Sequence, residues 1–345
     1  MKLLLFKSSL IQILLLCSLS VFINFSAQSS EVESDNDDNA AKLSFERLSK
    51  ALRELNFTTS FVVVKNNQAE PYHWLHGATE DTISGHPVEL EILALLNGPR
   101  RDILRIDNMV SYIEPEYAPY SITSSHISSQ IPAVFGQDIS VLENAYHFVS
   151  VGRSRVLGRI AQLIRIVPKD THRFGYWVWL DQQSGLLLKL AVITRKGQLL
   201  EQIQFTHLEI TDDISEHLKQ LQTADLPKII DVAAEQKETE LAWQVTWLPD
   251  GFKQIKSNRH RISANKQAVE FMLFNDGLVD LSVYVNPSKD NQRAIEFTYD
   301  GATLVLNQII NNVEISVVGK IPAATAKNIA NSVRFISDIS KPKQD

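Results

Sequence analysis

The sequence predicts an α+β protein built mostly of antiparallel β-strands. Residues 57–208 hold a long series of strand-like runs separated by tight turns such as Asn97-Gly98-Pro99. Residues 240–336 hold a second, shorter series that ends in a helix. Strands joined by short turns pair antiparallel, and 345 residues are enough for two cores. We therefore expect two domains, each with its own sheet.

The larger domain is predicted over residues 43–213. Phe45, Leu48, Leu52 and Leu55 recur at helical spacing, which predicts an amphipathic helix that packs on the sheet. Residues 120–145, which include Pro132, are expected to form a helix or loop across that sheet. The predicted strands are 57–64, 72–75, 88–95, 102–106, 109–113, 146–151, 163–167, 174–180, 186–194 and 199–208.

The smaller domain is predicted over residues 240–336, after a polar linker at 214–239. Its strongest local signal is Asn275-Asp276-Gly277, a hairpin turn between alternating runs at 269–273 and 279–285. Trp243, Val245 and Trp247 alternate onto one face of an earlier strand. Strands at 303–309 and 313–319 follow, and Pro322 opens a helix that runs to residue 333. Residues 337–345 are expected to be a tail.

The N-terminus is typical of a secretory signal peptide over residues 1–29. Lys2 and Lys7 precede an apolar run, and small residues follow it, including Ser26 and Ala27. The alternative is a retained N-terminal anchor. The next residues, 30–42, are acidic at first and are expected to be a disordered, solvated tail. The signal peptide predicts an exported protein.

Charge and cysteine content exclude several classes of function. The chain has 34 basic and 40 acidic residues, and losing residues 1–29 removes two lysines and no acid, so the net charge changes from −6 to −8. Such a balance argues against nucleic-acid binding, which needs concentrated positive charge. Cys17 is the single cysteine and lies within the signal peptide. The exported chain would have no disulfide, cysteine nucleophile or thiolate metal site.

No motif in the sequence predicts catalysis. His73 and His76 are the closest pair of histidines, but their odd spacing in a strand points them to opposite faces, so they do not predict a metal site. The segment around Ser154 resembles the start of a nucleophile elbow, but its closing glycine is absent. A hydrolase remains only a third option. We expect no catalytic residue, metal or cofactor, and a protein that is not an enzyme.

Aromatic and arginine residues are the candidates for binding. Alternation places Trp177 and Trp179 on one strand face, where they either pack under the amphipathic helix or line a lipid-accessible groove. The lipid-binding candidates are Trp74, Tyr112, Trp177 and Trp179. Paired arginines beside turns either are solvated or recognise anions and partner carboxylates. The anion or partner candidates are Arg100, Arg101, Arg153, Arg155, Arg259, Arg261 and Arg293.

Several segments resemble the RseB/MucB family of periplasmic regulators of the envelope-stress sigma factor, sigma-E. In the first domain they are GPRR at 98–101, SYIEP at 111–115, VSVGRSR at 149–155, IRIV at 164–167 and VWLD at 178–181. In the second they are WLPDGF at 247–252, NDG at 275–277 and VVGKIPAATAK at 317–327. The resemblance covers about residues 43–336 in order.

The resemblance implies a periplasmic, non-enzymatic negative regulator. Its first domain would be a LolA-like curved sheet or half-barrel closed by helices around an apolar cavity. The implied partner is the periplasmic domain of a membrane-spanning anti-sigma factor, which the protein would shield from regulated proteolysis. Lipopolysaccharide or lipoprotein acyl chains would release this grip, and a homodimer is left open. The alternative is a periplasmic lipid or lipoprotein carrier, although a simple carrier has no second domain of this size.

Overall fold

The structure is a computed structural model and describes residues 30–80, 87–127, 130–230, 240–261, 268–288 and 295–336. Contacts divide the chain into two compact units, one up to Asn36 and one from Asp37 onward. The predicted signal peptide and the C-terminal tail lie outside the described residues. Among the residues that are described, no helix is both long and apolar enough to cross a membrane.

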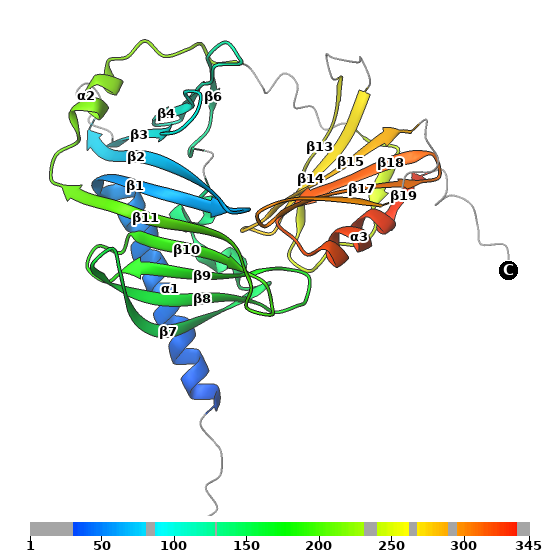
Figure 1. Cartoon of the computed structure of the whole chain (residues 1–345), viewed down its shortest axis with the longest axis horizontal. Helices are drawn as coiled ribbons and strands as arrows, with labels where there is room; N and C mark the ends of the chain where they lie inside the picture. The colour runs from blue at the N-terminus through cyan, green and yellow to red at the C-terminus, as the bar shows by residue number, and fades with distance from the viewer. Residues whose placement is uncertain are drawn as a thin grey trace, which may run out of the picture. The chain divides into compact units, whose positions relative to one another are not determined.

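The first domain is an eleven-stranded sheet in which every pair of neighbours is antiparallel (Figure 1). Its order is β6-β5-β4-β3-β2-β1-β11-β10-β9-β8-β7, so the first and last strands of the domain pair in the middle. The strands are β1 (Asn56–Lys65), β2 (Gln68–Glu80), β3 (Pro87–Leu95), β4 (Asp102–Ile106), β5 (Met109–Ile113), β6 (Tyr120–Thr123), β7 (Tyr146–Val156), β8 (Arg159–Pro168), β9 (Gly175–Asp181), β10 (Leu187–Ile193) and β11 (Leu199–Thr211).

From Ala41 onward, helix α1 (Ser30–Glu54) covers one face of this sheet, which we call the inner face. Phe45 and Leu48 of α1 are buried in the main core, and the Phe45 ring lies 5.7 Å from that of Phe148 on β7. Between β6 and β7 the chain forms two 3₁₀ turns, η1 (Ala133–Gly136) and η2 (Ile139–Leu142), which also pack against this core. The prediction of a helix on the sheet is therefore confirmed.

The expectation of a disordered tail at residues 30–42 is wrong, because α1 begins at Ser30. Two interactions stabilise the turns of α1 at residues 37–42, which belong to the second unit. Asp38 accepts a hydrogen bond from the backbone N–H of Phe148 and forms an i,i+4 ion pair with Lys42 at 2.6 Å. Acidic side chains are also favourable near the positive N-terminal end of a helix.

The predicted linker at 214–239 is partly folded onto the sheet. Helix α2 (Glu216–Gln222) is capped by Ser215 and buries Leu218 and Leu221 on the outer face of β2 and β3. A Cβ on Gly77 would lie 2.7 Å from a side-chain carbon of Ile214, so only glycine permits this close approach. Lys228 and Ile230 then bond the backbone of Ser121 on the edge strand β6, and the Ser121 hydroxyl donates to the carbonyl of Pro227. Residues 231–239 are not described.

The second domain is a six-stranded antiparallel sheet in the order β13-β14-β15-β18-β17-β16. Helix α3 (Ala323–Ser332) packs on it, and its Ile329 joins Leu281, Val283, Leu306 and Val317 in the core. The Asn275-Asp276-Gly277 turn joins β14 and β15 as predicted. The strands are β13 (Lys253–Arg261), β14 (Ala268–Asn275), β15 (Asp280–Pro287), β16 (Glu296–Asp300), β17 (Thr303–Ile310) and β18 (Val313–Gly319), with β12 (Trp243–Val245) paired to β19 (Val333–Phe335).

A buried arginine links the loop before β9 to the turns of the second domain. Arg173 is 1% exposed, and its Nε donates to Oδ2 of Asp276 at 2.8 Å, while its other nitrogens bond Asp170 and the carbonyl of Asp250. The hydroxyl of Tyr146 donates to the same Asp276 oxygen at 3.0 Å, and burial raises the pKa of Tyr146 well above its usual value. A cut near residue 239 would therefore expose a buried ionic cluster.

Candidate functional site

A cavity of about 320 Å³ opens on the inner face of the first sheet, beside the C-terminal end of α1. Strands β2, β3 and β4 form its floor, and residues 125–127, 131 and 132, which lie between β6 and η1, also line it. Its walls are apolar, from Trp74, Ile127, Ile131, Pro132 and Leu52. Its floor is charged, from Glu89, Glu91 and Arg105.

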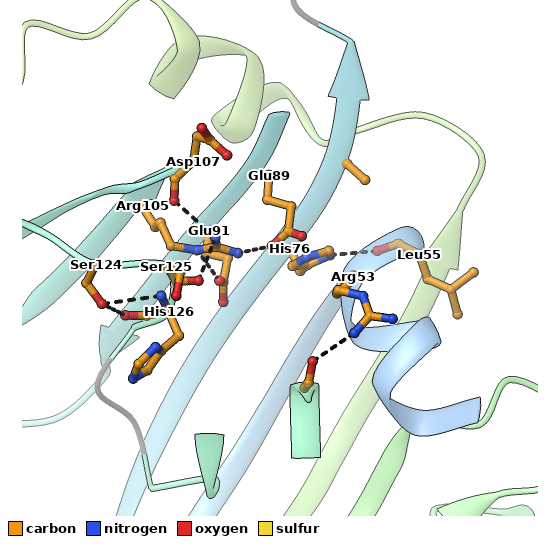
Figure 2. A network of polar contacts seen from close by, with 12 residues as sticks. Arg53, Leu55, His76, Glu89, Glu91, Arg105, Asp107, Ser124, Ser125 and His126 are labelled. Carbon is orange, nitrogen blue, oxygen red and sulfur yellow. Dashed lines mark hydrogen bonds and ion pairs between the residues drawn. The ribbon is translucent and has the colours of Figure 1, made fainter. Parts of the chain in front are cut away.

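The charged floor follows from strand register. Glu91 pairs with His76 on β2 and with Arg105 on β4, so the three side chains share the inner face. Arg105 Nε donates to Oε1 of Glu91 at 2.5 Å, and the guanidinium also bonds Glu89. Figure 2 shows this network, with further bonds from Arg105 to the carbonyls of Asp107 and Ser125, each at 3.1 Å.

Both oxygens of Glu91 have partners, because the indole N–H of Trp74 donates to Oε2 at 2.9 Å. The Trp74 ring is thereby fixed between the floor of the cavity and its apolar wall. Burial alone would lower the pKa of Arg105, but Glu91 and Glu89 outweigh burial and raise it. The floor is a paired ionic network rather than an isolated charge, and Glu89, with a side chain that is 28% exposed, is its most accessible member.

His76 links this network to helix α1. The side chain is 2% exposed, stacks on Phe57 at a centroid distance of 5.0 Å, and places Nδ1 2.7 Å from the carbonyl oxygen of Leu55 (Figure 2). Because a carbonyl only accepts, Nδ1 carries the proton, and Nε2 is buried with no partner among the described residues. Burial lowers the pKa of His76.

The lipid-binding candidates fall on two different faces of the sheet. Trp74 lines the cavity, and register from Trp74 through Leu93 and Ile103 places Tyr112 on the same inner face. Trp177 and Trp179 lie on the outer face, because it is Tyr176 and Val178 that join α1 in the core. The interpretation that the tryptophans pack under the helix is therefore wrong.

The arginine candidates do not gather into one site. Arg100 pairs with Asp102 at 2.6 Å, and Arg259 is bonded to Glu270. Arg101, Arg153 and Arg155 are exposed. Arg261 ends β13, but its side chain is not described, and Arg293 lies outside the described residues.

The sequence interpretation missed the charged floor and Arg173. A signal was present, because Glu89 and Glu91 occupy alternate positions among apolar residues of one predicted strand and Arg105 lies between Leu104 and Ile106 in the next. His73 and His76 do lie on opposite faces, as predicted, since His73 pairs with Ser60 and His76 with Phe57. In the described part of the chain, no cluster of three potential metal ligands is found.

An amphiphilic cavity on a curved antiparallel sheet, joined to a second sheet whose buried residues are continuous with the first core, is the architecture of a binding protein. The matches to family models agree with it. Residues 40–229 match the MucB/RseB N-terminal domain, and residues 237–334 match the MucB/RseB C-terminal domain. The chain belongs to the MucB/RseB family.

Named relatives and solved structures support this membership. The chain is 31% identical over 294 residues to the Sigma-E factor regulatory protein RseB of Escherichia coli K12. This match covers 84% of this chain and 89% of the relative. It is 30% identical over 292 residues to the Sigma factor AlgU regulatory protein MucB of Pseudomonas aeruginosa, with the same coverage. A structure of the Pseudomonas aeruginosa MucA/MucB complex matches with a TM-score of 0.67, 28% identity and coverage of 86% of this chain and 99% of that one. A crystal structure of MucB in complex with MucA(peri) matches with a TM-score of 0.66 and 27% identity, and covers 86% of this chain and 98% of that one.

Proposed function

We propose that this protein is a periplasmic negative regulator of an envelope-stress sigma factor. In this proposal it binds the periplasmic domain of a membrane-spanning anti-sigma factor and protects that domain from regulated proteolysis. The observation that carries the proposal is the match to both family domains, since MucB itself has been solved in complex with MucA(peri). The predicted signal peptide supports a periplasmic location.

We place the main part of the partner surface on the second domain. Of the aromatic anchors that its sequence offers, Trp243 and Phe274 are 1% and 3% exposed and belong to the core. Phe297 and Tyr299 are 38% and 55% exposed on β16, an edge strand of the six-stranded sheet. An edge strand offers unpaired backbone groups, and exposed aromatic residues are favoured interface anchors. Phe297 and Tyr299 are the accessible anchors that we assign to the partner.

The cavity of the first domain is our candidate for the release signal. Its apolar walls suit an acyl chain, and the partly exposed carboxylate of Glu89 in its floor suits a polar group of an amphiphile. Lipopolysaccharide or lipoprotein acyl chains have this chemistry. Occupation of the cavity would shift the protein away from the state that binds the anti-sigma factor, provided that the ligand has different affinities for the two states.

The alternative function is a periplasmic lipid or lipoprotein carrier, which the same cavity favours. The two functions differ in what they require of the second sheet. A carrier needs only the cavity, whereas a regulator needs an additional surface that distinguishes one protein partner. The experiment that separates them therefore measures protein binding first and lipid binding second.

The test uses calorimetry with the purified periplasmic segment of the anti-sigma factor from the same genome. We expect micromolar or tighter binding, and weaker binding by at least about tenfold for Tyr299→Ser, the loss typical of an interface anchor. Tyr117→Ser, at a tyrosine that is 65% exposed in the first domain, is the matched control. In a second assay, protease digestion of the segment should slow when the protein is present and recover when a lipoprotein-derived acyl peptide is added. Absence of protein binding, with lipid binding intact, would favour the carrier.

A further inference from the structure

The outer face of strands β8 to β11 carries two rows of side chains that no helix of the described chain covers. Helix α2 covers this face only over β2 to β4. The rows follow from strand register, which places residues directly opposite one another on neighbouring strands. One row is Val64, Gln202, Ala191, Trp177, Arg165 and Val149, and the next is Val62, Gln204, Lys189, Trp179, Leu163 and Gly152.

Two cations lie over two tryptophans in these rows. The guanidinium carbon of Arg165 is 5.7 Å from the ring centre of Trp177, and the Lys189 nitrogen is 4.8 Å from that of Trp179. The two indole rings are 6.1 Å apart. We call these four residues the tryptophan face.

No acidic residue occurs in either row. Within the described part of the chain, neither Arg165 nor Lys189 has a carboxylate within 4.0 Å. Burial lowers the pKa of Lys189, and no neighbouring acid offsets this shift. The tryptophan face therefore has a local positive charge on a protein whose net charge is negative.

A hollow of about 220 Å³ adjoins Trp177 at one end of this face. Arg165 and Arg195 both line it, together with the backbone around Gly197. Its one acidic residue, Asp170, is paired with Arg173. The hollow thus combines an aromatic wall with two guanidinium groups, which is the chemistry that recognises a phosphate group.

We propose that the tryptophan face docks on an anionic lipid bilayer. Indole rings favour the depth of lipid headgroups, and Arg and Lys extend their charged ends to phosphates while their stems lie along apolar surface. A row of apolar and neutral residues around two uncompensated cations fits that boundary by charge complementarity. The hollow beside Trp177 takes one headgroup phosphate. This docking needs neither the cavity nor β16, so it does not depend on the proposed function.

The test measures co-sedimentation of the chain from residue 30 onward, which holds every described residue, with lipid vesicles. We expect binding to vesicles of phosphatidylglycerol and phosphatidylcholine, and little binding to pure phosphatidylcholine. Binding should weaken as salt increases, because surface charges are then screened. Equal binding to both kinds of vesicle, or none to either, would overturn the proposal.

Two sets of variants locate the contact. Arg165→Gln/Lys189→Gln should reduce partitioning into anionic vesicles by roughly 25- to 30-fold, since each basic residue near such a surface contributes about fivefold. Lys50→Gln/Lys219→Gln removes two equally positive residues that are 69% and 48% exposed on α1 and α2, and should leave partitioning unchanged. An equal loss in both double variants would mean that net charge alone drives binding, which contradicts a specific face.

Fluorescence quenching then tests the tryptophans themselves. Lipids brominated near the headgroup should quench the wild-type emission, and Trp177→Phe/Trp179→Phe should abolish most of that quenching while the circular dichroism spectrum is retained. Unchanged quenching in this variant would overturn the proposal. An acidic peptide, polyglutamate, is the other occupant to exclude: if it binds the tryptophan face while anionic vesicles do not, the face recognises a protein segment instead.

Discussion

Replacing Arg105 with methionine should lower the free energy of unfolding by about 3–5 kcal/mol. Arg105 is 4% exposed, and the side chain of its partner Glu91 is 6% exposed. The substitution leaves a carboxylate buried without its cation, which costs far more than the loss of an exposed pair. Lys50 and Glu54, by comparison, are 69% and 59% exposed and contribute about 0–1 kcal/mol.

A second substitution tests whether the buried charge causes the loss. Glutamine at position 91 keeps an oxygen that can accept the indole N–H of Trp74, but it removes the negative charge. Glu91→Gln/Arg105→Met should therefore be more stable than Arg105→Met alone. The two substitutions should be non-additive by about 1–3 kcal/mol, as expected for residues in one network.

Urea unfolding followed by circular dichroism measures these differences, with Lys50→Met as the control at an exposed lysine. Equal m-values across the series would establish that the variants differ in stability rather than in the extent of unfolding. A loss below about 1 kcal/mol for Arg105→Met, or strict additivity in the double variant, would refute the reasoning.

Three further predictions concern His76, two glycines and Arg173. Burial lowers the pKa of His76 below its usual value of 6.5, so at lower pH the unfolded chain binds more protons than the folded one. The contribution of His76 to stability is therefore complete above about pH 6.5 and is lost as the pH falls. His76→Asn keeps a donor near the Leu55 carbonyl and should flatten this slope in unfolding measured at several pH values, with exposed His207→Asn as the control. Gly197 and Gly277 have φ values of +81° and +98°, so alanine at either position should cost about 1–2 kcal/mol. A Cβ at Gly277 would also lie 2.7 Å from a side-chain carbon of Leu142, whereas a Cβ at Gly197 meets nothing within 4 Å. Gly277→Ala should therefore lower the melting temperature more than Gly197→Ala. Arg173→Lys replaces a guanidinium with three partners by a single ammonium and should cost at least about 2 kcal/mol in urea unfolding.

Local patterns in the sequence predicted most strands, because alternation and turn chemistry are local properties. The runs at 102–106, 109–113 and 313–319 coincide with β4, β5 and β18. Strand β16 was missed, because all five of its residues are exposed and no buried face imposes alternation. Helix α2 was missed as well, since its seven residues bury only Leu218 and Leu221.

The sequence did not predict which face of strand β9 packs against the core. Rows of aromatic residues belong to a core more often than to a ligand site, so the sequence favoured packing of Trp177 and Trp179 under the helix. Register decides otherwise, because Tyr176 and Val178 are aligned with Ile166 and Ile164 of β8 and with Val192 and Leu190 of β10. The charged floor depends in the same way on which strands are neighbours, a non-local property that one strand does not encode.

The pairing of β1 with β11 has a consequence for how the chain is made. Asn56 pairs with Thr211, so the central ladder joins residues 155 positions apart, whereas almost every other neighbouring pair is a local hairpin. At about 5–20 residues per second, β11 leaves the ribosome roughly 8–30 s after β1. Two meanders, β1 to β6 and β7 to β11, can form early, but each then presents an open apolar edge until the ladder closes. The central ladder cannot close before β11 has been made, so one side of the segment 57–64 stays unpaired in that interval.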